Sequence, residues 1–250
     1  MDLPLLATLL LVSAVVGSFV GTLVVRLPAH HPVVMDRSRC PACDTQLRVA
    51  ELVPILSWLI LRGRCRTCHQ RIGTFYPLIE GAAIGVAFWA ATVVTGWALW
   101  ASCIFGWSLL ALALIDWRHR LLPDKLTLPL LPAGLGIAFL IDRQNLAAHA
   151  LGAVSGFLSF AAIAAAYRSW RGREGLGGGD FKLFGGIGAW VGWDGLPSVV
   201  LIASISALGV SSLEWARGRR LSLSDEIPFG SYLSIAGWIV WLYGPLTLNR

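Results

Sequence analysis

Long apolar runs without charged side chains recur along the whole chain. A bilayer core takes about 20 apolar residues in a helix. Seven charge-free stretches stand out: Leu3 to Val25, Gly81 to Ile115, Leu126 to Ile141, Gln144 to Tyr167, Leu183 to Trp193, Gly195 to Leu213 and Ile227 to Asn249. The stretch from 81 to 115 is too long for one crossing, and a turn at Thr95-Gly96 divides it. The pattern predicts an all-α polytopic membrane protein with about eight transmembrane helices, of which residues 183–193 form a full or a re-entrant span.

The composition supports this interpretation, because 56% hydrophobic and only 14% charged residues do not suit an ordinary soluble domain. Lysine and arginine accumulate in short cytoplasmic loops. When eight spans alternate, 18 of the 20 Lys and Arg residues fall on one side, in segments 26–75, 116–125, 168–182 and 215–226. We expect that side to be cytoplasmic and the N-terminus external. Topology and contact with anionic lipids then account for the net charge of +6 without nucleic acid.

A polar segment between the first two predicted spans carries two CxxC pairs, Cys40 with Cys43 and Cys65 with Cys68. Four thiolates can surround zinc tetrahedrally and leave no open coordination position, which is typical of a structural site. Disulfide bonds are the alternative, but the loop is predicted to face a reducing cytosol where they rarely persist. The segment therefore predicts a small cytoplasmic zinc-binding loop domain, in which His69 is a solvated neighbour rather than a ligand.

Two aspartates beside predicted spans are the candidate catalytic residues. Asp116 ends a span that runs inward, where a negative charge opposes the helix macrodipole. Asp180 follows a glycine-rich stretch and begins a span that runs outward, so both acids are expected near the cytoplasmic face. Two adjacent aspartates share one proton, so that one activates water while the other polarises a peptide carbonyl. This arrangement predicts an aspartyl hydrolase.

The two acids also fit roles that involve no hydrolysis. Both carboxylates suit a proton-coupled transporter, and Asp180 suits a helix N-cap. A zinc-dependent scaffold protein would need neither acid. Among the neighbours, we expect Asp124 to cap the helix that follows it, Lys182 to reach lipid headgroups, and His149 to be a hydrogen-bonded packing residue.

The order of motifs resembles the type IV prepilin leader peptidases, membrane aspartyl proteases of the GxGD kind. The resemblance is carried by VGSFVGTLVVRLP (16–28), SRCPACDTQL (38–47), VPILSWLILRGRCRTCHQRI (53–72), YPLIE (76–80), IDWRHRLLPDKLTLPLL (115–131), GGGDFKLFGGIGAWVGW (177–193) and IPFGSYL (227–233). It implies that Asp116 and Asp180 are the catalytic pair. It also implies cleavage of the basic leader from type IV prepilins or secretion pseudopilins at the cytoplasmic face of the bacterial inner membrane.

The resemblance further implies methylation of the new N-terminal amine with S-adenosylmethionine. Two departures bear on methylation rather than on cleavage: Gly21 stands where the family usually has Asn, and Leu52-Val53-Pro54 replaces a stretch like Asn-Ile-Pro. Glu80 matches a family residue, for which stabilisation of the helix dipole is the simpler role. The predicted organisation is a first transmembrane helix (1–27), the four-cysteine loop domain (28–75) and a multi-span protease domain (76–250).

Overall fold

The structure, a computed structural model, describes residues 3–33, 37–172, 177–218 and 227–246. Most of these residues are helical, and the only β-pairing among them consists of two isolated bridges. The chain divides into two compact units, Met1–Trp107 (unit 1) and Ser108–Arg250 (unit 2). The predicted all-α class is confirmed.

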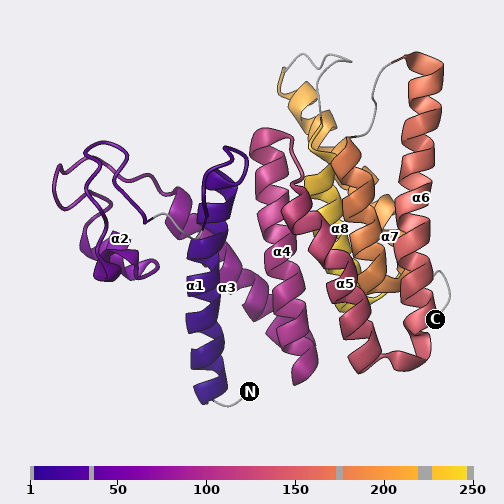
Figure 1. The fold of residues 1–250 in the computed structure, drawn as a ribbon, viewed down its shortest axis with the longest axis horizontal. Coiled ribbons are helices and arrows are strands. Elements are labelled where there is room, and N and C mark those ends of the chain that lie inside the picture. Colours follow the sequence, from indigo (N-terminus) through magenta and orange to yellow (C-terminus); the bar gives the residue numbers. More distant parts are fainter. Residues whose placement is uncertain (1–2, 34–36, 173–176, 219–226, 247–250) are drawn as a thin grey trace. The chain divides into compact units, whose positions relative to one another are not determined.

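Unit 1 is built on two long helices that pack closely through small residues (Figure 1). It contains α1 (Leu3–Arg26), the short η1 (Val49–Leu52) and α2 (Leu56–Ile60), α3 (Phe75–Val93), and the start of α4 (Trp97–His119). A Cβ atom at Gly17 would lie 2.6 Å from the Glu80 Cα, so only glycine allows this approach of α1 to α3. The predicted turn between α3 and α4 is confirmed, with Gly96 at φ +65°.

Unit 2 holds the end of α4 and four further helices (Figure 1). They are α5 (Asp124–Ile141), α6 (Leu146–Arg171), preceded by η2 (Arg143–Asn145), α7 (Gly178–Ala216) and α8 (Phe229–Tyr243). Glycines at the α6–α7 contact let the two backbones touch. A Cβ at Gly156 would lie 2.8 Å from the Phe184 carbonyl oxygen, and a Cβ at Gly152 would meet the Gly188 carbonyl. This close packing fixes the first half of α7 against α6.

Helix α7 is interrupted at Gly192, whose φ of 77° and ψ of 171° are not helical. The first half runs toward the end of α8, because the Trp190 and Trp241 rings lie 5.3 Å apart. The second half starts there, with a Cβ at Gly195 3.2 Å from Val240. It returns toward the start of α8, where Glu214 interacts electrostatically with Tyr232. The two halves therefore correspond to two of the predicted spans.

Six helices among the described residues are long and apolar enough to cross a membrane. They are Leu3–Arg26, Phe75–Val93, Trp97–His119, Asp124–Ile141, Arg143–Arg171 and Gly178–Ala216, and Phe229–Tyr243 is a shorter apolar helix. Because α7 is two segments, each of the eight predicted spans corresponds to a helix or half-helix within the described residues. The charge-free stretch that begins at Leu183 belongs to a helix that starts at Gly178, so Asp180 lies in its first turn, as expected.

Candidate functional site

Asp116 lies in the last turn of α4, where its side chain is buried and hydrogen-bonded to α8. Its Oδ2 accepts the Ser231 backbone N–H at 2.7 Å and lies 3.0 Å from the Ser231 hydroxyl. Ser231 is in the first turn of α8, whose N-cap residue, Pro228, provides no capping side chain. Asp116 therefore caps α8 from another helix, and the dipole of α8 stabilises the charge that the dipole of α4 opposes.

Asp180 occupies the first turn of α7. Its Oδ2 accepts the Gly177 backbone N–H at 3.1 Å, so the carboxylate caps its own helix. This cap explains why α7 starts before Asp180 rather than after it. Asp180 thus contributes to the helix cap, but from the third helical position rather than as the N-cap residue, which is Gly177. Among the described residues, the contact engages one of its two carboxyl oxygens.

The two aspartates converge although they are remote in the sequence. The negative charge of Asp116 acts repulsively on Asp180. Leu122 packs beside Gly179, which precedes Asp180, and beside Gly230, which precedes the Asp116 partner Ser231. A Cβ at Gly179 would lie 2.5 Å from the Leu122 Cβ, and one at Gly230 would lie 2.7 Å from its Cδ1. The same Cβ at Gly230 would lie 3.2 Å from the Asp116 Oδ2. Glycine at these two positions therefore leaves room around the pair.

The structure gives two neighbouring residues a contact that the sequence did not predict. The Lys182 ammonium, which was expected to reach lipid headgroups, lies 2.7 and 2.9 Å from the two Asp124 carboxylate oxygens. Asp124 begins α5, but its side chain makes no capping hydrogen bond, because Pro123 is the N-cap residue. This ion pair joins the start of α5 to the start of α7, beside Asp180.

His149 is the hydrogen-bonded packing residue that was predicted, with Nδ1 3.1 Å from the Ala189 carbonyl oxygen. It also lines a cavity of about 410 Å³ with Asp142, Asp194 and Trp241. This cavity adjoins the end of α8, whereas Asp116 adjoins its start. The cavity and the aspartate pair are therefore separate features of unit 2.

The four predicted metal ligands come together in unit 1. Their sulfur atoms all lie within 4.8 Å of one another, with 3.8 Å between Cys40 and Cys68 and 3.9 Å between Cys43 and Cys65. A tetrahedral zinc–thiolate centre with bonds of about 2.3 Å has sulfurs about 3.8 Å apart. The donor set and its spacing therefore fit a zinc ion. His69 is not part of this group.

The two CxxC segments fold into equivalent turns. The backbone N–H of Asp44 donates to the Cys40 carbonyl at 2.9 Å, and that of His69 donates to the Cys65 carbonyl at 3.0 Å. Asp44 and His69 both have φ of 55°. His69 is thus a turn residue, which explains why it is adjacent to a ligand in sequence without joining the cluster.

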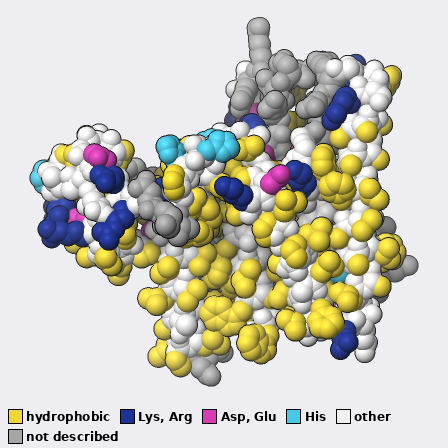
Figure 2. All heavy atoms as spheres, viewed as in Figure 1, with side chains coloured by type: hydrophobic (Ala, Val, Ile, Leu, Met, Phe, Trp, Pro, Cys, Tyr) yellow, Lys and Arg dark blue, Asp and Glu magenta, His cyan; other side chains and the backbone are white. Residues whose placement is uncertain are grey.

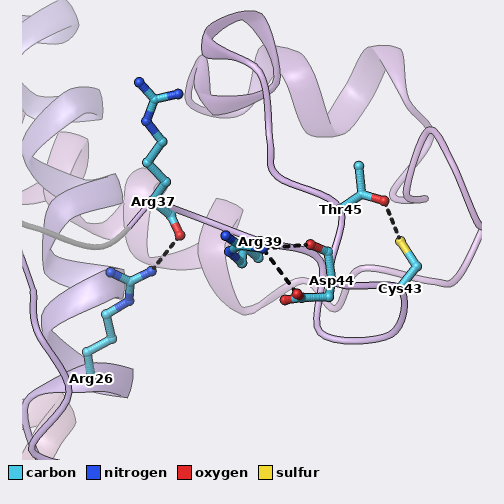
Figure 3. Close-up of polar contacts among 6 residues, drawn as sticks. All are labelled: Arg26, Arg37, Arg39, Cys43, Asp44 and Thr45. Carbon is cyan, nitrogen blue, oxygen red and sulfur yellow. Dashed lines mark hydrogen bonds and ion pairs between the residues drawn. The ribbon is translucent and has the colours of Figure 1, made fainter.

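Polar contacts surround the first CxxC turn and the Cys43 thiol (Figure 3). The Cys43 sulfur lies 3.3 Å from the Thr45 hydroxyl, and hydrogen bonding to Thr45 lowers the pKa of Cys43 to about 6. The contact with Thr45 therefore favours the thiolate form of Cys43. Arg39 pairs with Asp44 at 3.1 Å, and Arg26 donates to the Arg37 carbonyl at 3.4 Å.

Glu80 has a contact that the sequence did not predict. Its carboxylate is buried in α3 and accepts the Ile55 backbone N–H at 2.7 Å. Ile55 has a φ of 58°, an unusual conformation for a β-branched residue. The signal for this contact was a carboxylate inside an apolar helix, which requires a partner. The sequence could not say that the partner is a backbone N–H of the cysteine loop.

Sequence comparisons with known proteins cover nearly the whole chain. Residues 11–95 match the bacterial peptidase A24 N-terminal domain, and residues 103–212 match the type IV leader peptidase family. A protein named prepilin leader peptidase/N-methyltransferase from Aeromonas hydrophila is 38% identical over 262 residues, which cover 94% of this chain and 89% of that protein.

Two further relatives carry the same name. The protein from Dickeya chrysanthemi is 38% identical over 257 residues, covering 93% of this chain and 90% of that protein. The protein from Burkholderia pseudomallei (strain 1026b) is 41% identical over 220 residues, covering 87% and 71%. No solved structure matches the chain.

Proposed function

We propose the following function from one established fact: the chain belongs to the type IV leader peptidase family. It cleaves the leader peptide from type IV prepilins or secretion pseudopilins, and Asp116 and Asp180 are its catalytic pair. The observation that carries the proposal is the convergence of these two acids, 64 positions apart in sequence, around Leu122 and the start of α8 in a chain of this family. The comparisons give no support to a proton-coupled transporter.

The contacts of the two acids indicate how they divide the chemistry. Asp116 receives the Ser231 backbone N–H, lies within hydrogen-bonding distance of the Ser231 hydroxyl, and is stabilised by the positive charge of Arg120. Among the described residues, Asp180 receives one backbone N–H, and it interacts with the negative charge of Asp116. Donors that point at a carboxyl oxygen favour its ionised form. Asp116 is therefore the base, and the proton that the pair shares is held by Asp180.

The reaction then needs only water and the two side chains. Asp116 takes a proton from a water molecule as the water oxygen attacks the scissile carbonyl carbon, and Asp180 gives its proton to the carbonyl oxygen. The tetrahedral intermediate collapses when the C–N bond breaks. Asp116 then passes its proton to the leaving amine, and Asp180 recovers a proton from a hydroxyl of the intermediate. One water molecule is consumed for each peptide bond.

The predicted topology suits this substrate. A prepilin keeps its basic leader in the cytoplasm and its apolar helix in the bilayer, as the family resemblance implies. The bond to be cut then lies near the cytoplasmic boundary of the inner membrane. Both aspartates belong to helix ends that adjoin Lys- and Arg-rich segments, which the positive-inside rule assigns to that face.

We extend the proposal to N-methylation of the new N-terminal residue, with S-adenosylmethionine as the methyl donor. The support is the name of the relatives, which pairs the two activities. No described residue is assigned to binding the donor. Cys40, Cys43, Cys65 and Cys68 would hold one structural zinc ion, which would order the loop between α1 and α3.

Mass spectrometry of a purified prepilin tests both activities at once. The detergent-purified full chain is incubated with the prepilin, with and without S-adenosylmethionine. We expect loss of the leader in both samples and the added mass of one methyl group only when the donor is present. An intact prepilin in both samples would refute the peptidase. A cleaved but unmethylated product would refute the second activity alone.

A further inference from the structure

Helix α2 turns an apolar face outward. Leu56, Leu59 and Ile60 share one side of this helix because they are spaced i, i+3 and i+4. Their exposed fractions are 59%, 56% and 79%, so three large apolar side chains of one short helix face outward together. We name these three residues the α2 face.

The opposite side of α2 is packed into the cysteine loop, the polar segment 37–72. A Cβ at Gly63 would lie 2.9 Å from the Trp58 ring, and the Trp58 indole donates to the Ile72 carbonyl at 3.2 Å. The tryptophan therefore anchors α2 to its own loop. The α2 face is left for a partner outside the loop.

The structure places α2 beside the end of a membrane-spanning helix. Ile55, directly before α2, donates its backbone N–H to Glu80 of α3 at 2.7 Å, and the α1 backbone at Gly17 packs against Glu80. Figure 2 shows apolar side chains along the lower edge of the lobe that the cysteine loop forms. That edge lies beside α1, on the side toward its N-terminal end (Figure 1). The α2 face therefore lies near the depth where the bilayer surface meets α1 and α3.

Charge decides which partner fits this surface. Exposed arginines surround α2 in the sequence, namely Arg48, Arg62, Arg64 and Arg71. A basic leader peptide or the same loop of a second copy would be repelled by them. An anionic lipid surface would be attracted, and apolar side chains flanked by arginine are typical of segments that lie in the membrane interface.

We propose that the α2 face inserts into the cytoplasmic leaflet of the same membrane, while the neighbouring arginines bind the phosphates of anionic lipids. This contact would hold the cysteine loop against the bilayer from outside the spans. It is independent of the peptidase chemistry, because no residue of the aspartate pair takes part.

Photocrosslinking of the full chain in nanodiscs tests the proposal. Benzoylphenylalanine is placed at Leu59 or, as a control, at Gln70, which is exposed on the cysteine loop outside α2. In discs that contain phosphatidylglycerol, we expect lipid adducts at position 59 and none at position 70. Three results would overturn the proposal. They are adducts at position 59 to another copy or to an added prepilin, the absence of any adduct at position 59, and equal yields of lipid adducts at positions 59 and 70.

The charge of the lipid provides a second arm. The yield of lipid adducts at position 59 should be higher in discs with phosphatidylglycerol than in discs of phosphatidylcholine alone. Arg64→Gln should lower that ratio by up to about fivefold, the effect of one arginine near an anionic surface. Equal yields in the two kinds of disc, or an unchanged ratio in the variant, would refute the role of the arginines.

Discussion

Removing the metal centre should unfold the cysteine loop while leaving the long helices intact. Within residues 37–72 only Cys40, Gly63 and Cys65 are buried, so the loop has almost no apolar core of its own. The sulfur separations of 3.8 and 3.9 Å let zinc bind without rearrangement. Structural zinc contributes about 10–16 kcal/mol in small zinc domains. Losing only about 4 kcal/mol of this would make local opening about a thousandfold more frequent.

The assay combines zinc analysis with hydrogen exchange on the purified full chain. Cys40→Ser should contain no zinc, and the backbone amides of residues 37–72 should exchange about a thousandfold faster or more. Amides of α5 and α6 should be unaffected. The control is His69→Asn, because asparagine tolerates the positive φ at this position and the residue lies outside the sulfur cluster.

Either of two results would refute this reasoning. Full zinc content and unchanged exchange in Cys40→Ser would show that the sulfur cluster neither binds a metal nor orders the loop. Loss of zinc in His69→Asn, with the four cysteines intact, would show that the ligand set is wrong.

Two further predictions concern unit 2. Ser231→Ala removes a hydroxyl that lies 3.0 Å from the Asp116 Oδ2, so kcat should fall by about tenfold with KM unchanged. The control is Ser234→Ala, which loses only a bond to its own helix. A parental kcat in Ser231→Ala would contradict the prediction. Gly188→Ala should lower the unfolding temperature, because the new Cβ would meet the α6 backbone at a cost of about 1–3 kcal/mol. The control is Gly209→Ala, which has open space around it and should not lower the unfolding temperature. Equal unfolding temperatures for the two variants would contradict this prediction.

The sequence predicted what depends on local pattern. Apolar run lengths gave the helices, and the CxxC spacing gave the four sulfurs that cluster in unit 1. The position of Asp116 was identified as unusual because it opposes the dipole of its own helix. The structure shows the compensation, which is the N-terminus of α8, more than a hundred residues later in the sequence.

What could not be predicted depends on contacts between distant segments. Lys182 and Asp124 were assigned separate local roles because nothing in their neighbourhoods reveals a partner 58 positions away. Ser231 resembled any small polar residue near a helix start. The break in α7 was expected after Trp193 rather than at Gly192, because a single backbone torsion leaves no hydropathy signal.

Cleavage kinetics of two single variants test the central claim most directly. Asp116→Asn and Asp180→Asn keep the size of each side chain and an oxygen that can accept its capping hydrogen bond. We expect each variant to accumulate in the membrane with parental thermal stability and to lose prepilin cleavage by at least about a thousandfold, since neither a base nor a proton donor can be replaced by an amide. Asp194→Asn, which lines the separate cavity, should cleave like the parental chain. Near-parental cleavage by either Asp116→Asn or Asp180→Asn would contradict the account.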